Sequence, residues 1–183
     1  MRISISGSYS TGKTTLAAAV AHHLKGACGD AKVGLIDETA RRVIALGFQL
    51  DRAATLEAYL TYVYLQLEAE RNMKADIVIS DRSLADVLAY VWLNADPGLP
   101  PVFTSLLEEI VRLESRYFDV YCYLPIEFPL IEDGVRTNDV NYQHSVDLSF
   151  RKVLSSFKLP FHVVSGSMAE RIAHVAKLAR GLG

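Results

Sequence analysis

The stretch "GSYSTGKT", residues 7–14, matches the pattern G-x-x-x-x-G-K-[ST] at every fixed position. The run "RISIS" (2–6) precedes it, and a helical apolar pattern begins at Lys13. Glycines let backbone N–H groups turn inward around phosphate oxygens, and the positive end of the following helix points toward them. A strand, a glycine loop and a helix in this order predict a nucleotide-phosphate site. Its predicted residues are Gly7, Ser8, Tyr9, Ser10, Thr11, Gly12, Lys13, Thr14 and Thr15.

Two side chains of this loop and one carboxylate further along the chain predict ATP and Mg²⁺ as cofactors. We expect Lys13 to reach the β- and γ-phosphates and the hydroxyl of Thr14 to hold Mg²⁺. Asp81 directly follows the apolar run "DIVIS" (76–80), where a carboxylate can hold the ion directly or through water. On its own, such an aspartate more often caps the next helix. Together with the glycine loop, Asp81 and Thr14 are the predicted metal residues.

Length and composition predict one globular domain over residues 1–183. Hydrophobic residues make up 50% of the chain and charged residues 22%, with a net charge of −2. No apolar run approaches the length of a membrane-spanning helix, and the near-neutral charge gives no nucleic-acid footprint. The N-terminus lacks the long apolar region of a signal peptide. The two cysteines, Cys28 and Cys122, form no metal-binding or redox motif, so we expect reduced thiols in a cytoplasmic protein.

Short apolar runs alternate with longer helical patterns along the chain. The predicted strands are 2–6, 32–37, 76–80, 120–124 and 161–164, and the predicted helices are about 13–25, 38–47, 52–74, 83–94, 103–117, 141–157 and 167–181. Strands that are apolar nearly throughout and are separated by helices favour a three-layer α/β fold, with five parallel strands covered by helices on both faces. Ligands in such sheets bind beyond the carboxyl ends of the strands.

The second predicted strand ends in an acidic pair, Asp37-Glu38. A carboxylate here is placed to accept a proton from an attacking hydroxyl, and an acidic pair at a helix start equally suits capping, so both interpretations stay open for each residue. Arg41 and Arg42 lie one turn further on, where one is expected to face solvent and the other to reach toward an anionic substrate. Arg82 faces a substrate phosphate or pairs with a carboxylate.

The segment after the fourth strand predicts a lid over about residues 125–142. Prolines, Asp133-Gly134 and a short polar run interrupt the regular pattern there. Arg136 in this turn would neutralise charge on a transferred phosphoryl group, as would Arg151 on the helix behind it. An ordinary surface loop is the alternative.

Two further stretches are ambiguous. "VSGSMAER" (164–171) turns through a glycine and is a candidate edge for the nucleotide base. Tyr59, Tyr62 and Tyr64 either flank a substrate base or belong to a partly buried helix face.

The stretches "GSYSTGKTTL", "DETARRV", "DRSLADVLAY" and "IEDGVRTND…YQHSVDLSFRKVL" together resemble a family of small P-loop ATPases and kinases. That family is related to the ribosylnicotinamide kinase domain of the bacterial NAD-metabolism regulator, and more distantly to deoxynucleoside and thymidylate kinases. The resemblance implies a strand order of 2-3-1-4-5 and phosphoryl transfer from ATP, with Mg²⁺, to a small nucleoside-like acceptor. The catalytic residues that it and the motifs predict are Lys13, Asp37, Glu38, Arg82 and Arg136.

An ATP-dependent kinase acting on a nucleoside or nucleotide is therefore the leading hypothesis. If the acceptor is a monophosphate, Arg41, Arg42 or Arg82 would bind its phosphate. The alternative is a regulatory ATPase, in which water is the acceptor and a protein partner senses the nucleotide state. The expected ligands are ATP and a small acceptor. The sequence leaves the acceptor's identity and the oligomeric state open, a homodimer being one alternative.

Overall fold

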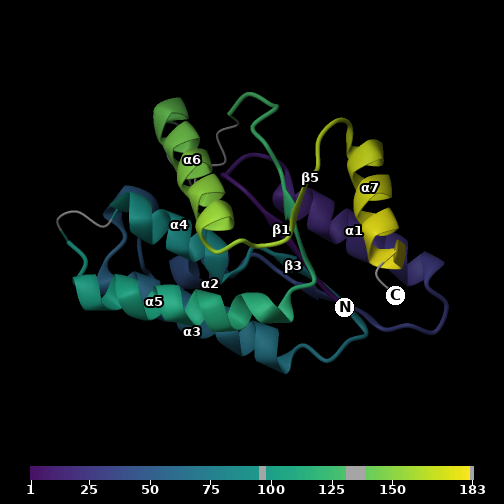
Figure 1. Ribbon diagram of the computed structural model, residues 1–183, viewed down its shortest axis with the longest axis horizontal. Coiled ribbons are helices and arrows are strands. Elements are labelled where there is room, and N and C mark those ends of the chain that lie inside the picture. Colours follow the sequence, from purple (N-terminus) through teal and green to yellow (C-terminus); the bar gives the residue numbers. More distant parts are fainter. Residues whose placement is uncertain (95–97, 131–138, 182–183) are drawn as a thin grey trace.

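Five parallel strands form the central layer of the computed structural model, which describes residues 1–94, 98–130 and 139–181 (Figure 1). The strands are β1 (Arg2–Ser6), β2 (Val33–Ile36), β3 (Ile77–Asp81), β4 (Val120–Tyr123) and β5 (Phe161–Val163). Their order is β2-β3-β1-β4-β5, and each neighbouring pair is parallel. The predicted α/β fold, the five strands and the strand order are confirmed.

Seven α-helices accompany the strands in the described part of the chain. They are α1 (Lys13–Ala27), α2 (Thr39–Ala45), α3 (Leu56–Asn72), α4 (Leu84–Asn94), α5 (Pro101–Glu114), α6 (Val140–Ser156) and α7 (Met168–Gly181). Two short 3₁₀ turns, Asp51–Ala53 and Ser115–Tyr117, precede α3 and follow α5. The helix predicted at 52–74 begins later, at Leu56, because the side chain of Thr55 accepts a hydrogen bond from the backbone N–H of Ala58 and caps the helix.

The inner strands β1, β3 and β4 are buried on both faces, whereas the edge strand β5 is exposed. Along β1, Ile3 and Ile5 pack with α1 and α7 on one side. Tyr121 and Tyr123 of β4 pack with α3, α4, α5 and α6 on the other. Figure 1 shows α1 and α7 on one side of the strands and α4, α5 and α6 on the other. Among the described helices, none is both long and apolar enough to cross a membrane.

Three predicted site segments lie together at the carboxyl ends of the strands. They are the glycine loop, the acidic pair Asp37-Glu38 and Asp81. β1 lies between β3 and β4, and Ile5 of β1 is in register with Asp81 at the end of β3. The glycine loop follows β1, and the acidic pair follows β2, which is the neighbour of β3. Because all the strands are parallel, their carboxyl ends lie together, at the position where ligands bind in such folds.

Candidate active site

The glycine loop has a backbone that only glycine adopts easily at two of its positions. Gly7 has φ +135°, and a Cβ atom there would lie 2.6 Å from the carbonyl oxygen of Leu124. Gly12 has φ +85° at the N-cap of α1. Side chains at these positions would strain the loop or collide with β4's continuation. The two fixed glycines of the motif therefore set the shape of the loop.

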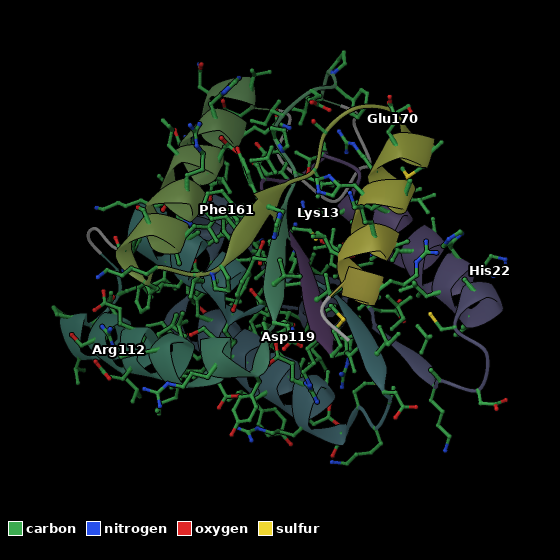
Figure 2. All side chains as sticks on the ribbon, turned by 45° about the vertical axis from the view of Figure 1, so that its right-hand side comes forward. Lys13, His22, Arg112, Asp119, Phe161 and Glu170 are labelled. Carbon is green, nitrogen blue, oxygen red and sulfur yellow. The ribbon has the colours of Figure 1, made fainter. Side chains whose placement is uncertain are left out.

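Lys13 folds back over this loop. Its side chain is buried, and its Nζ atom donates a hydrogen bond to the carbonyl oxygen of Ser8 and lies 3.4 Å from Oγ1 of Thr11. Figure 2 shows Lys13 at the opposite end of the sheet from Asp119, which directly precedes β4. The ammonium group is thus at the carboxyl ends of the strands, inside the curve of the loop.

Asp81 has the surroundings of a magnesium ligand. It is 1% exposed, and neither carboxylate oxygen has a hydrogen-bond partner among the described residues. Burial raises the pKa of Asp81, while Arg82, the hydroxyl of Thr14 and Lys13 lower it by a smaller amount. The hydroxyl of Thr14 is close enough to lower this pKa but makes no well-aligned hydrogen bond to either oxygen. A buried carboxylate in this state is costly, and a divalent cation would satisfy both oxygens. Thr14 and Asp81 therefore fit Mg²⁺ by charge and ligand type.

Arg82 joins the loop to an acidic side chain of the neighbouring segment. It is 3% exposed, and its Nε and Nη2 atoms each donate to Oε1 of Glu38 at 3.2 Å. Its Nη1 atom donates to the carbonyl oxygen of Gly7 at 3.4 Å and lies 3.8 Å from Oδ1 of Asp86. Burial lowers the pKa of Arg82, but neighbouring acidic groups, Tyr90 and Glu38 foremost, raise it to well above its usual value. Arg82 therefore stays charged.

The structure separates the two adjacent carboxylates that the sequence left equivalent. Glu38 is buried beside Arg82, and its other oxygen accepts a hydrogen bond from Nε of Arg41 at 3.2 Å. Asp37 is exposed and lines a different, shallow hollow together with Arg42, which is paired with Glu68. No side-chain capping hydrogen bond is found for Glu38 at the start of α2. Glu38, Arg41 and Arg82 are thus brought together, whereas Asp37 and Arg42 lie apart from them.

A cavity of about 490 Å³ opens beside Glu38 and Arg82. Its walls come from α2, the segment 46–55, α3 and α4 and are mostly apolar or aromatic. Its lining residues are Glu38, Ala40, Arg41, Ile44, Phe48, Gln49, Leu50, Asp51, Arg52, Ala53, Tyr59, Tyr62, Arg82, Val87 and Tyr90. Of the three tyrosines considered from the sequence, Tyr59 and Tyr62 line the cavity, while Tyr64 is 67% exposed. The volume and lining are typical of a small-molecule site.

The N-terminal turn of α6 holds the glycine loop from the other side. The hydroxyl of Ser8 donates to the carbonyl oxygen of Gln143, and Nε2 of Gln143 donates to that of Tyr9, both at 2.8 Å. The hydroxyl of Tyr9 donates to the carbonyl oxygen of Asp139 at 2.7 Å. Asp139 caps α6, since its side chain accepts from the N–H of Tyr142.

The predicted lid is described only at its two ends. Arg136, predicted to be catalytic, lies outside the described residues. Arg151 lies about three turns into α6, is exposed and is paired with Asp147 of the same helix. Among the described residues, the ion pair found for Arg151 is with a neighbour on its own helix.

The N-terminal end of α6 also contacts the wall of the cavity. Nη2 of Arg52 lies 2.7 Å from Oδ2 of Asp139, and the guanidinium group lies over the ring of Tyr142. Nδ2 of Asn94 is 3.0 Å from each of three oxygens, the carbonyl oxygen of Asp51 and the hydroxyls of Tyr59 and Tyr142. The sequence analysis did not single out Asn94 or Arg52, whose partners are far away in the chain.

Arg171 supports the loop from α7, at the place considered as an edge for the nucleotide base. It is buried, and its nitrogens donate to the carbonyl oxygens of Thr11 at 2.9 Å and Gly166 at 3.0 Å and to Oε2 of Glu127 at 2.6 Å. The turn at residues 164–171 is therefore attached directly to the back of the glycine loop. No local pattern in the sequence indicates this contact, because Thr11 is 160 positions away from Arg171.

Comparison with solved structures finds the same fold in several kinases. Thymidylate kinase from Ehrlichia chaffeensis superposes with a TM-score of 0.70 at 19% identity, covering 98% of both chains. Deoxyadenosine kinase from M. mycoides gives a TM-score of 0.64 at 13% identity, covering all of both chains. The NadR protein in complex with NR gives a TM-score of 0.76 at 22% identity, and the match covers 98% of this chain but 50% of NadR. This chain thus spans about half the length of NadR.

The chain matches one family model but none of the curated proteins. No curated protein matches the chain. The family model described as "AAA domain" matches residues 2–171, nearly the whole chain. The chain therefore belongs to this AAA domain family, and its fold is that of the small P-loop kinases its sequence motifs resemble.

Proposed function

We propose that this protein is an ATP- and Mg²⁺-dependent kinase that phosphorylates a hydroxyl group of a small nucleoside-like acceptor. The observation that carries the proposal is the pair of Glu38 and Arg82, which lines the cavity. Arg82 also contacts the carbonyl oxygen of Gly7 in the glycine loop, residues 7–14, which we now call the phosphate loop. An acceptor in the cavity would therefore present its reacting end to the γ-phosphate. The kinases among the structural neighbours support the same reading.

The phosphate loop would bind ATP. Backbone N–H groups of residues 8–15 and the ammonium group of Lys13 would hold the phosphates, and Thr14 and Asp81 would hold Mg²⁺. The ion supplies positive charge that neutralises the phosphoryl oxygens. Lys13 already lies within the loop, so little reorganisation is needed when the phosphates bind.

Glu38 would act on the acceptor. It would orient the acceptor hydroxyl and take its proton as the oxygen attacks the γ-phosphorus, while the bond to the β–γ bridging oxygen breaks and ADP leaves. Arg82, fixed by two hydrogen bonds to the same carboxylate oxygen, would keep Glu38 oriented and add positive charge beside the transferred group. Arg136, from the proposed lid, would also neutralise the charge on the transferred phosphoryl group.

The charges near the reacting end favour an acceptor hydroxyl over an acceptor phosphate. Each nitrogen of Arg82 already faces Glu38, Gly7 or Asp86, and Arg41 is paired with Glu38. A phosphate group placed there would lie next to the carboxylate of Glu38 and be repelled by it. The aromatic walls would pack against a flat base. We therefore favour a nucleoside over a nucleoside monophosphate.

The test is ADP release from Mg·ATP in the presence of nucleosides, nicotinamide riboside and nucleoside monophosphates, with products identified by mass spectrometry. Lys13→Ala serves as the blank. Release that depends on one compound, with its phosphorylated form as product, would establish the kinase. Steady release that no acceptor changes would reject it for these compounds and favour the regulatory ATPase.

A further inference from the structure

Asp86 is a buried carboxylate within an otherwise apolar stretch of α4. It is 2% exposed, and its helix neighbours Ala85, Val87 and Leu88 are buried in the apolar core. Carboxylates are rarely buried to this degree unless several donors satisfy them. Asp86 belongs neither to the fixed positions of the phosphate-loop motif nor to the cavity lining.

The donors around Asp86 come from the start of the phosphate loop and from the turn that contains Arg82. Oδ1 accepts from the backbone N–H of Gly7 at 3.2 Å, and Oδ2 accepts from the hydroxyl of Ser6 at 2.8 Å. Oδ2 also accepts from the backbone N–H and the hydroxyl of Ser83, at 3.0 and 3.1 Å. Nη1 of Arg82 lies 3.8 Å from Oδ1. One carboxylate thus contacts the first residue of the phosphate loop and the residue that follows Arg82.

Both contacted segments have unusual backbones that need support. Gly7 has φ +135°, and Arg82 has φ +81°, in the left-handed region that residues with a Cβ rarely adopt. Two contacts stabilise this backbone conformation. The hydroxyl of Ser80 donates a hydrogen bond to the carbonyl oxygen of Arg82, and the next residue, Ser83, donates to Asp86. Asp86 therefore holds the glycine turn at Gly7 and the strained turn at Arg82 together.

We propose that Asp86 is a positioning residue that fixes the phosphate loop and Arg82 relative to each other. Its consequence for phosphoryl transfer rests on the proposed function, because Arg82 acts on the acceptor side. Its consequence for nucleotide binding rests on the loop alone, because Gly7 is the first residue of the loop. The two consequences can be measured separately.

The substitution Asp86→Asn would test the role of the carboxylate without changing the size of the side chain. The N–H groups of Gly7 and Ser83 face different oxygens of Asp86, and neither N–H can accept a hydrogen bond. Oδ2 accepts three hydrogen bonds and Oδ1 accepts one, so the N–H₂ of Asp86→Asn would take the place of Oδ1. It would then face the N–H of Gly7 and lie beside Nη1 of Arg82, and the loop would lose its support.

The first readout is the affinity for Mg·ADP by calorimetry, which needs no acceptor. We expect Asp86→Asn to weaken it by about tenfold, the range for losing one hydrogen bond to a charged group. Thermal unfolding without nucleotide reports separately on the fold. A variant that is less stable but binds Mg·ADP within twofold of the wild type would overturn the proposal, since that is the behaviour of a purely structural residue.

A matched pair keeps the test decisive if Asp86→Asn does not fold. Ser4 and Ser6 are both buried on β1, with their hydroxyls 2.6 Å apart, but only Ser6 donates to Asp86. We expect Ser6→Ala to weaken Mg·ADP binding several-fold and Ser4→Ala to leave it unchanged. Equal affinities in the two variants would overturn the proposal.

The second readout is turnover with the acceptor that the wild type phosphorylates. We expect Asp86→Asn to lower kcat by about tenfold at saturating nucleotide, because Arg82 loses its fixed position. A change in the KM for ATP with unchanged kcat would overturn the link to Arg82. If the wild type phosphorylates no acceptor, the proposed function fails, while Mg·ADP affinities still decide whether Asp86 positions the loop.

Discussion

Arg82 donates two hydrogen bonds of 3.2 Å to a single oxygen of Glu38, and both side chains are buried where the cavity meets the phosphate loop. A cation and a carboxylate fixed in this way hold each other's orientation. The pair therefore links the place where an acceptor would bind to the place where a nucleotide would bind.

Arg82→Lys should disable turnover while keeping the charge. A lysine has no planar fork, so it cannot contact Glu38 and Gly7 at the same time. We expect kcat to fall about 100-fold, as for loss of an electrostatic contact made in the transition state. Acceptor-dependent ADP release measures it.

Arg42→Lys is the matched control for this substitution. Arg42 is exposed and paired with Glu68, away from the cavity. Its kcat should stay within twofold of the wild type. A similar loss of kcat in both variants would show that the Glu38–Arg82 contact is not specifically required for turnover.

Asp81→Asn should separate metal binding from nucleotide binding. The two unpartnered oxygens of Asp81 favour a cation, and an amide is a poor ligand for Mg²⁺ at this place. We expect the variant to bind ADP without Mg²⁺ as well as the wild type does, and to lose the gain in affinity that Mg²⁺ gives. Calorimetry with and without Mg²⁺ checks this, and an undiminished magnesium effect would exclude Asp81 as a ligand.

Glu70 should make stability depend on pH. Burial raises the pKa of Glu70 to about 7, partly opposed by the hydrogen bond from Gln66. Because the pKa of Glu70 is higher in the folded state than in the unfolded state, the contribution of Glu70 to the free energy of unfolding is most favourable below about pH 4.5. That contribution is lost as the pH rises to 7. Glu70→Gln should therefore gain little at pH 4.5 and about 3 kcal/mol at pH 8, from a pKa difference of about 2.5.

Urea unfolding of Glu70→Gln and the wild type at both pH values tests this prediction. The difference between the two proteins isolates Glu70 from other titrating groups. A gain that is equal at pH 4.5 and pH 8 would mean that Glu70 does not titrate in this range.

Asn94 and Arg52 should differ in their contributions to stability, although both connect the cavity wall to α6. The two N–H bonds of the Asn94 amide group are within reach of three oxygens in a partly buried place, so Asn94→Ala should cost about 2 kcal/mol. Arg52 is 63% exposed in its ion pair with Asp139, so Arg52→Ala should cost less than about 1 kcal/mol. Urea unfolding measures both, and a larger loss for Arg52→Ala would contradict this ranking.

The features that the sequence predicts well depend on neighbouring residues. The left-handed turn at Gly12 and the helix that starts at Lys13 are encoded within one short motif, and apolar runs mark the five strands. The sequence left the role of the three tyrosines of α3 open, but their local spacing explains how the structure divides them. Tyr59 and Tyr62 are three residues apart and share a helix face that lines the cavity, whereas Tyr64 lies on the exposed face.

The features that the sequence leaves open depend on distant contacts. Asp37 and Glu38 are adjacent, and the one that is buried is the one that meets Arg82, 44 positions further on. Asp86 stands out as an acid in an apolar helix, but its partners Ser6 and Gly7 come from the first strand and the loop after it, about 80 positions away. No local pattern reports such pairings, because the sheet's strand order creates them.

In the proposed reaction, Glu38 activates an acceptor bound in the cavity. The most direct measurement is acceptor-dependent kcat for Glu38→Gln and for Asp37→Asn, with Mg·ADP affinity as a check on folding. The two carboxylates are adjacent, but only Glu38 lines the cavity. We predict a loss of about 100-fold or more for Glu38→Gln and less than twofold for Asp37→Asn. Equal losses, or a larger loss for Asp37→Asn, would contradict the account.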